Sequence, residues 1–326
     1  MNVLVTGAAG YIGSVLTEEL LKEGNLVVAL DNLKQGSREA ISSEASFIQA
    51  DLCDSKRLEQ VFQQHKIDTV IHLAADSIVS DSMTDPVKVF NNNVINGMNL
   101  VNAMIEHGVN QLIFASTASV YGEPEHIPIK ESEPTRPVNP YGESKLMFER
   151  ILYWYASAYG LKSITLRFFN AAGASKRYGE VHDPETHLIP NILKVALGQA
   201  DEISVFGQDY PTDDGSCIRD YIHVIDIASA IILSLEYLER YTGSMIFNMG
   251  NNRGYSVNEV IETVQNVTGT RIPVSVCSRR QGDPAILVAD SELIKSELGW
   301  KPKYSSIENI IESAWQWQKT HPYGYG

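Results

Sequence analysis

The chain begins with an apolar run that ends in a glycine-rich turn. Residues 3–7 read VLVTG, and Gly7, Gly10 and Gly13 then lie three residues apart at the start of an amphipathic stretch. A side chain on the first glycine would block a tight bend, and one on the second would hold a diphosphate away from the helix N-terminus. Glycine triplets also occur in turns that bind nothing, and this spacing departs from the G-x-G-x-x-G pattern. We expect a strand, a tight turn and a helix whose N-terminus suits an anion.

Short apolar runs alternate with longer amphipathic stretches through most of the chain. Strands that are apolar on both faces and connected by helices are typical of a doubly wound parallel sheet in an α/β protein. We expect the strands of this sheet at 3–7, 26–30, 46–50, 69–75, 111–116, 164–169 and 245–250. The last strand follows a helix expected at 222–238, so the chain returns late to its first sheet.

A change of amino-acid composition after Asn170 predicts a second, smaller mixed α/β lobe. Residues 171–190 are rich in glycine, proline and polar side chains, and a short helix is expected near 188–197. The terminal HPYGYG is expected to be frayed. We therefore expect two interleaved domains, one made of 1–170 plus about 220–250 and the other of about 171–219 plus 251–326.

The charge and the apolar pattern exclude several classes of protein. With 40 acidic and 26 basic side chains the formal net charge is −14, which argues against attraction to nucleic acid or to an anionic membrane. The chain begins MNVLVTG, which already contains the first expected strand, and it holds no apolar run long enough to span a bilayer. We expect a cytoplasmic protein with a small-molecule partner.

The cysteines point to a reducing compartment. Cys53, Cys217 and Cys277 lie far apart and form no CxxC pair. Neither a disulfide framework nor a cysteine zinc site is predicted from that spacing. No metal is expected.

Acidic residues follow two of the expected strands. Asp31 ends the second strand after the glycine-rich turn, where a carboxylate accepts hydrogen bonds from the hydroxyls of an adenine ribose and repels a 2′-phosphate. This position favours NAD over NADP, although a solvated acid can simply end a strand. Asp51 and Leu52 follow the third strand and could flank an adenine.

Tyr141 and Lys145 lie one helical turn apart in a helix that Pro140 opens. A phenol loses its proton near pH 10, and neighbouring cations lower that value, so Tyr141 is a candidate acid/base and Lys145 its electrostatic partner. The same spacing is common in surface pairs. Thr117, at the end of the strand at 111–116, adds a hydroxyl that can bond a substrate oxygen, although a threonine there is more often a strand cap.

Taken in this order, the motifs resemble the extended short-chain dehydrogenase/reductase superfamily and, within it, the UDP-glucose (UDP-galactose) 4-epimerases. The likeness covers nearly the whole chain, and its most specific segment is VFGQDYPTDDGSCIRDYIHV at 205–224. The other shared motifs are GAAGYIG at 7–13, DNL at 31–33, HLAADS at 72–77, NNNV at 91–94, STASVYGE at 116–123, PYGESK at 140–145, RFFNAAGA at 167–174, HLIP at 187–190 and RRQGDPA at 279–285.

The resemblance implies a Rossmann-type NAD-binding domain and a lobe that binds a UDP-hexose. Carried over onto matching positions, the NAD contacts are Gly7, Gly10, Tyr11, Ile12, Gly13, Asp31, Asn32, Asp51, Leu52, Leu73, Ala74, Ala75, Asn92, Tyr141, Lys145 and Phe169. The substrate contacts are Thr117, Asn170, His187, Leu188, Phe206, Arg219, Arg279, Asp283 and Leu287. An arginine fork suits a diphosphate better than lysine does, although arginines also form surface ion pairs.

Three of these positions differ among family members. Thr117 replaces a serine and keeps its hydroxyl, while His187 stands where some members have asparagine and is otherwise an ordinary loop histidine. The resemblance implies that Leu287 lies beside the sugar 2-position, where in family members an aromatic side chain excludes an N-acetyl group and a small one admits it. Leucine leaves both N-acetylated and uronic UDP-sugars open as substrates.

The implied reaction is redox-neutral inversion at C4 of the hexose, with Tyr141, Thr117 and Lys145 as catalytic residues. A nucleotide-sugar dehydratase or decarboxylase shares the first step, but dehydratases of the family carry an Asp-Glu pair after the strand-end threonine, and here Ala118 and Ser119 follow it. A non-catalytic NAD-binding sensor on the same fold would usually lack the tyrosine and lysine. Apolar helix faces, including the aromatic stretch at 145–159, predict a homodimer, although burial in the protein's own layer explains them equally well.

Overall fold

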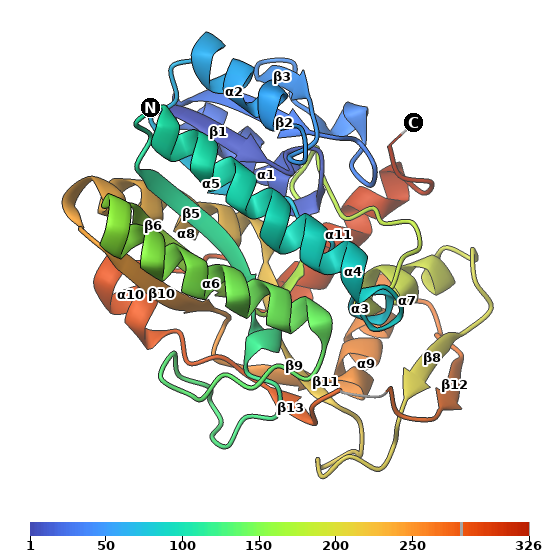
Figure 1. The fold of residues 1–326 in the computed structure, drawn as a ribbon. Helices are drawn as coiled ribbons and strands as arrows, with labels where there is room; N and C mark the ends of the chain where they lie inside the picture. Colours follow the sequence, from blue (N-terminus) through green and yellow to red (C-terminus); the bar gives the residue numbers. More distant parts are fainter. Residues whose placement is uncertain (281–282, 326) are drawn as a thin grey trace.

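The computed structural model describes residues 1–280 and 283–325. Gln281 and Gly282 of the RRQGDPA motif and the terminal Gly326 lie outside the described residues. Within the described chain the largest sheet has seven parallel strands in the order β10-β6-β5-β4-β1-β2-β3 (Figure 1). They are β1 (Asn2–Thr6), β2 (Leu26–Asp31), β3 (Ser46–Gln49), β4 (Thr69–His72), β5 (Gln111–Thr117), β6 (Lys162–Phe168) and β10 (Ser244–Met249). The predicted doubly wound sheet is confirmed, including the late return of the chain in β10.

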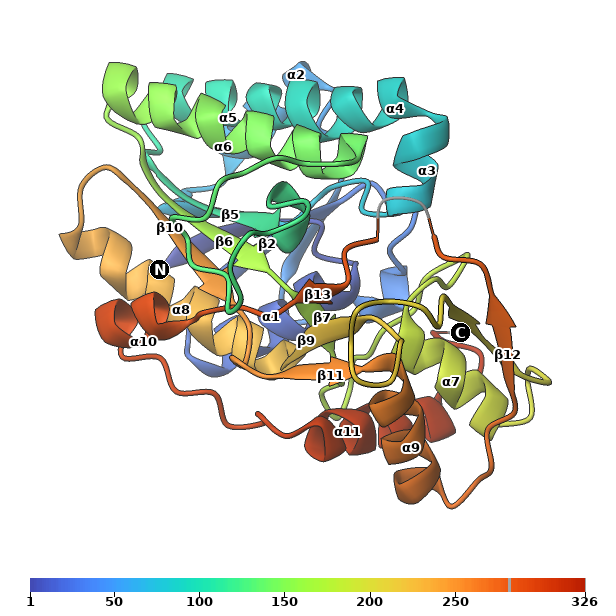
Figure 2. The ribbon, with the colours of Figure 1, turned by 90° about the horizontal axis from the view of Figure 1, so that it is seen from below.

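Helices cover both faces of this sheet, which is why its strands are apolar on both sides. Leu4 of β1 packs into one layer and Val5 into the other, and both are fully buried. Figure 2 shows α2, α5 and α6 on one face and α1, α8 and α10 on the other. Their bounds are α1 (Tyr11–Lys22), α2 (Ser55–Gln64), α5 (Asn96–Glu106), α6 (Pro140–Tyr159), α8 (Val224–Arg240) and α10 (Glu292–Leu298). Shorter elements in the same part of the chain are η1 (Arg38–Ala40), α3 (Val79–Thr84), α4 (Pro86–Phe90), the π-helical η2 (Asn91–Ile95) and η3 (Ala118–Val120).

A smaller mixed α/β part lies beside the carboxyl ends of these strands. One of its sheets combines β7 (Asn170–Ala172), β9 (Ile218–His223), β11 (Gly254–Ser256) and β13 (Ile286–Leu287), and the other pairs β8 (Ile203–Phe206) with β12 (Val274–Cys277). Around them lie α7 (Leu188–Ala196), α9 (Val257–Thr268) and α11 (Ile307–Thr320). These helices share one core, in which Ile192, Val260 and Ile310 are fully buried.

Two local expectations were wrong. The helix expected at 222–238 begins at Val224, because Ile222 and His223 end β9 and the His223 side chain accepts a hydrogen bond from the Ile225 N–H. The fraying expected at the chain end is not observed at Tyr325. The Tyr325 ring packs near Trp317, and its hydroxyl accepts a hydrogen bond from the Gly179 N–H and donates one to the Gly179 carbonyl. Aromatic packing orders this tail, and a composition rich in glycine does not reveal it.

The structure also bears on the membrane expectation. Among the described residues, the helices are all too short or too polar to cross a bilayer.

Candidate active site

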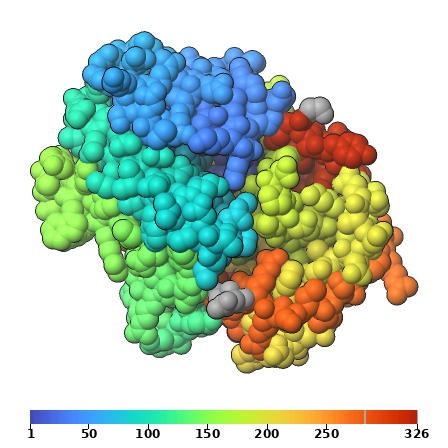
Figure 3. Space-filling model, turned by 45° about the vertical axis from the view of Figure 1, so that its right-hand side comes forward, coloured from blue at the N-terminus to red at the C-terminus, as the bar shows by residue number. Residues whose placement is uncertain are grey.

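A cavity of about 1540 Å³ lies at the carboxyl ends of the parallel strands. Gly7 follows β1, Asp31 ends β2 and Thr117 ends β5, and all three line the cavity. Residues of α7 and β9 form its other wall. Figure 3 shows the surface hollowed where the blue-to-green half of the chain meets the yellow and orange part. Open parallel sheets bind their ligands at this edge.

The glycine-rich turn forms one end of the cavity as the sequence predicts. Gly7 has a φ of +72°, a left-handed conformation that favours glycine, and it makes the tight bend. No side chain caps the N-terminus of α1 at Gly10, and Tyr11 and Ile12 line the cavity. A Cβ on Gly13 would come within 2.1 Å of the Gly7 carbonyl oxygen. The turn therefore presents a bare helix N-terminus, with its partial positive charge, to any anion in the cavity.

The acidic residues after β2 and β3 lie beside this turn. The Asp31 carboxylate accepts the Ala9 N–H at 2.9 Å and the Leu33 N–H at 2.8 Å, which ties the end of β2 to the turn and leaves acceptor capacity unused. Asp51 is bonded by the Asn32 amide and by Lys34, each at 2.9 Å. Burial would raise the pKa of Asp51, but the Cys53 N–H, Lys34 and Asn32 hold it well below its usual range. Lys34 is a cavity residue that sequence reasoning missed.

Local capping explains where the helix that carries Tyr141 begins. The Asn139 side chain accepts the Gly142 N–H at 2.8 Å, and Pro140 occupies the first turn. Tyr141 and Lys145 consequently lie on the cavity side of α6, and both line the cavity with Thr117. The structure brings together the three side chains that the sequence proposed as one group.

The electrostatics of this group differ from the expectation. Burial raises the pKa of Tyr141 above its ordinary value, and a hydrogen bond with Thr117 lowers it only in part. Burial also lowers the pKa of Lys145 to about 7, against the attraction of Glu149. The Lys145 Nζ donates to the Ala115 carbonyl at 2.9 Å and lies 6.0 Å from the Tyr141 ring centre. Lys145 is not among the groups that shift the pKa of Tyr141 in the ligand-free chain, where burial outweighs the hydrogen bond with Thr117.

A buried ion pair beneath Lys145 was also missed by the sequence analysis. Arg167 donates two hydrogen bonds to the Glu149 carboxylate, from Nε at 3.0 Å and from Nη2 at 2.6 Å. Each of the two side chains is 4% exposed. Ser116 donates to the same carboxylate, and Arg167 also donates to the Tyr121 hydroxyl. This network joins α6 to β5 and β6, and Glu149 within it favours the charged form of Lys145. A single sequence gives no signal for it, because Glu149 and Arg167 pair only once strand and helix are packed.

The other end of the cavity carries the predicted substrate residues, with one exception. Those that line it are Asn170, His187, Leu188, Phe206, Arg219, Asp283 and Leu287. Arg219 extends from β9, with 11% of its side chain exposed, and lies 3.7 Å from Asp283. Arg279 is not among the described residues that line the cavity; it bonds Asp209 and stacks over Tyr210. Its neighbour Arg280 does line the cavity, with its guanidinium 4.1 Å from the centre of the Phe206 ring.

All the predicted NAD contacts line the same cavity, from the glycine-rich turn to Phe169. One end thus offers a helix N-terminus, the other offers arginines, and Tyr141 with Thr117 lies between them. Such an arrangement can hold two anionic ligands whose reacting groups meet at a phenol that exchanges a proton.

Comparison with known proteins is consistent with this geometry. Residues 3–250 match the NAD dependent epimerase/dehydratase family. The UDP-glucose 4-epimerase of Halalkalibacterium halodurans is 51% identical over 327 residues, covering 100% of this chain and 98% of that protein. A crystal structure of a UDP-glucose 4-epimerase superposes with a TM-score of 0.97 at 47% identity, covering 100% of both chains. The UDP-glucose 4-epimerase of Bifidobacterium longum, solved with NAD⁺ and UDP, has a TM-score of 0.96 at 36% identity, again over 100% of both chains.

Proposed function

Because the chain belongs to the NAD dependent epimerase/dehydratase family, we propose that it interconverts UDP-glucose and UDP-galactose by NAD-dependent, redox-neutral inversion at C4 of the hexose. The observation that carries the proposal is the placement of Tyr141 and Thr117 between two anion-binding ends of one cavity. NAD is the cofactor, in agreement with relatives solved with NAD bound. Family members that act on UDP-glucose match this chain over its full length.

Each part of the chain has a distinct task in this reaction. NAD, held at the glycine-rich turn and beside Lys145, would supply the hydride acceptor and donor of this reaction. Tyr141 removes the proton of the sugar 4-hydroxyl, either directly or through the Thr117 hydroxyl, and gives it back after the 4-keto sugar has turned. Lys145 binds the ribose beside the phenol, and Glu149 with Arg167 keeps that lysine in position.

The two ends of the cavity hold the two diphosphates. The turn at Gly7, Gly10 and Gly13 binds the cofactor pyrophosphate, and the Asp31 carboxylate accepts hydrogen bonds from the hydroxyls of the adenosine ribose. We assign NAD to residues 1–170 with about 220–250, and the nucleotide sugar to about 171–219 with 251–326. The UDP part supplies most of the substrate affinity, because the sugar must be free to turn about its diphosphate.

Product analysis with two substrates tests this function. With UDP-galactose, the NAD-loaded protein should form UDP-glucose without net consumption of NAD. UDP-N-acetylgalactosamine, assayed beside it, reports on Leu287, which lines the cavity and is 9% exposed. A 4-keto-6-deoxy product would instead identify a dehydratase, and complete inactivity of folded, NAD-loaded protein on UDP-sugars would leave only an NAD-binding sensor.

The arginines at the substrate end allow a sharper test of binding. We expect Arg219→Gln and Arg280→Gln each to raise the KM for UDP-galactose roughly 10- to 100-fold, because each removes charged donors from a diphosphate. Arg279→Gln is the matched comparison, since it is the neighbour that the family motif predicts and it bonds Asp209. If Arg279→Gln raised the KM more than Arg280→Gln did, Arg279 and not Arg280 would be the residue that binds the substrate diphosphate.

An exposed apolar surface supports a homodimer. Tyr153, Trp154 and Tyr159 on α6 are 62%, 67% and 60% exposed, and Val87 on α4 and Ile95 in η2 lie on the neighbouring helical segment and are also exposed. Large apolar side chains exposed on neighbouring helices commonly mark protein interfaces. We propose that this surface pairs with a second copy of the chain in the cytoplasm. Sedimentation velocity should show dimers for the wild type and monomers for Trp154→Glu; dimers that persist in the variant would place the interface elsewhere.

A further inference from the structure

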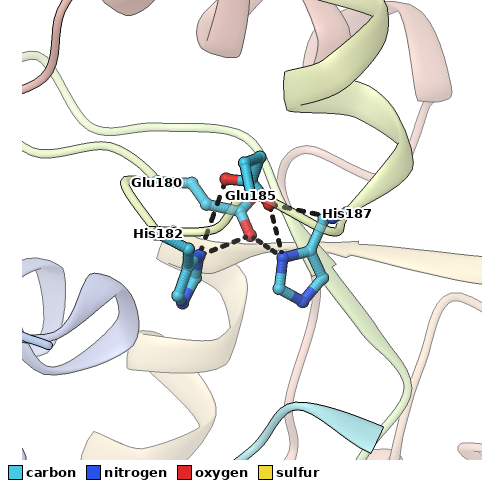
Figure 4. A group of neighbouring side chains, drawn as sticks. All are labelled: Glu180, His182, Glu185 and His187. Carbon is cyan, nitrogen blue, oxygen red and sulfur yellow. Dashed lines mark hydrogen bonds and ion pairs between the residues drawn. The ribbon is translucent and has the colours of Figure 1, made fainter. Parts of the chain in front are cut away.

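Four potential metal ligands meet in the segment that connects β7 to α7. Glu180, His182, Glu185 and His187 lie within eight residues of chain, and Figure 4 shows their side chains turned toward one another. One ligand atom from each lies within 4.8 Å of every other. All four residues also line the cavity of the candidate active site. Only His187 belongs to the substrate assignment, and neither assignment includes Glu180, His182 or Glu185.

The spacing of these atoms matches a small tetrahedral ion. The Glu180 Oε1 lies 2.8 Å from the His187 Nδ1 and 3.4 Å from the His182 Nδ1. The Glu185 carboxylate lies 2.9 Å from the His187 Nδ1 and 3.7 Å from the His182 Nδ1. Zinc bonds of about 2.0–2.2 Å in tetrahedral geometry place ligand atoms about 3.3–3.6 Å apart. The four separations, from 2.8 to 3.7 Å, bracket that range, so small side-chain movements suffice.

Burial and charge also favour a cation between these groups. The side chains of Glu180 and Glu185 are 7% and 3% exposed, and both carboxylates form ion pairs with the imidazoles of His182 and His187. The Nδ1 of His182 is buried, and within the described residues neither the Glu180 Oε1 at 3.4 Å nor the Glu185 Oε2 at 3.7 Å is placed to form a hydrogen bond with it. Buried nitrogen atoms of this kind are rarely left without a partner. One divalent cation would neutralise both carboxylates and occupy both Nδ1 atoms at once.

We propose that Glu180, His182, Glu185 and His187 bind one Zn²⁺ ion through two carboxylate oxygens and two imidazole nitrogens. Imidazole with carboxylate suits zinc better than the all-oxygen sets that calcium and magnesium take. With four protein ligands the site is closed, so the ion is structural and holds residues 180–187 in the cavity wall. It also leaves the proton of His187 on Nε2, which makes that nitrogen a donor. The cysteines do not contribute, because the cluster contains none.

Zinc content and affinity of the NAD-loaded protein test the proposal. After dialysis against a chelator and re-addition of ZnCl₂, the wild type should retain one zinc per chain through gel filtration. His182→Gln should weaken zinc affinity at least about 100-fold, since even partners one step removed from a metal account for 10- to 100-fold. The matched control is His126→Gln, which removes a histidine from another pair with a glutamate, Glu133, and should keep full zinc affinity.

Two further measurements keep the test decisive. Zinc should raise the unfolding temperature of the chelator-treated wild type, a readout that does not depend on any variant folding. Cobalt in place of zinc should give a tetrahedral spectrum without a thiolate charge-transfer band, which excludes binding at Cys53, Cys217 or Cys277. Zinc binding that is equal in the wild type and His182→Gln, a thiolate band, or no retained zinc in the wild type would each overturn the proposal in favour of a metal-free histidine–glutamate ion-pair cluster.

Discussion

Replacement of Tyr141 by phenylalanine is expected to lower kcat about 10²- to 10⁴-fold, the range that general acid/base groups contribute. The substitution removes only the hydroxyl, so packing in the cavity and NAD content should stay as in the wild type. Turnover of UDP-galactose by the purified, NAD-loaded variant measures the effect. Because the ring remains, the KM should change far less than kcat.

The control for this variant lies on the same helix. Tyr159→Phe removes a hydroxyl from the exposed end of α6 and should leave turnover unchanged. If Tyr141→Phe turned over substrate at near wild-type rate, the proton would have to pass through another group, and the proposed role of Tyr141 would be wrong. The Thr117 hydroxyl, which forms a hydrogen bond with this phenol, is then the first candidate for that role.

Alanine at Gly13 is expected to destabilise the whole protein, whereas alanine at Gly10 should affect NAD alone. A Cβ on Gly13 would overlap the Gly7 carbonyl oxygen, and overpacking against backbone costs about 1–3 kcal/mol or more. A Cβ on Gly10 would lie 3.4 Å from its nearest neighbour, so the fold accommodates it. In the cavity, however, that Cβ would separate a pyrophosphate from the N-terminus of α1.

Unfolding temperature and NAD affinity separate the two effects. We expect Gly13→Ala to lower the unfolding temperature of the NAD-free protein. Gly10→Ala should retain that temperature and bind NAD roughly 10- to 100-fold more weakly, because hydrogen bonds to a charged group are lost. The control is Glu23→Ala at the exposed end of α1. Normal NAD affinity in Gly10→Ala would move the pyrophosphate away from this turn.

Most of the fold could be predicted from the sequence because its signals are local. Each expected strand of the large sheet is present within a few residues, since apolar runs bounded by turns depend on neighbours in the chain. The boundary at 222 was wrong because Ile222 and His223 are as apolar or neutral as the helix that follows, and only pairing with β7 makes them strand. The order of Tyr325 depends on contacts with Trp317 and Gly179, which no local pattern contains.

The candidate site was predictable where it depends on strand ends and less so elsewhere. Gly7, Asp31 and Thr117 follow or end parallel strands, and such positions necessarily meet at one edge of the sheet. Arg279 and Arg280 are equivalent in sequence, and only the direction of each side chain makes Arg280 the one that lines the cavity. Side-chain direction in an irregular loop has no period from which it could be inferred.

The sequence by itself determined the order of the chemical groups along the chain. They are a glycine that makes a tight turn, an acidic residue at the end of the next strand, and a tyrosine one helical turn before a lysine. These depend on backbone conformation and on spacing of 3.6 residues per turn, which local residues dictate. Only the tertiary structure decided the charge state of the site. Burial raises the pKa of Tyr141 and lowers that of Lys145, because the cost of a charge depends on what surrounds it and not on where it lies in the chain. Packing of distant elements likewise pairs Glu149 with Arg167.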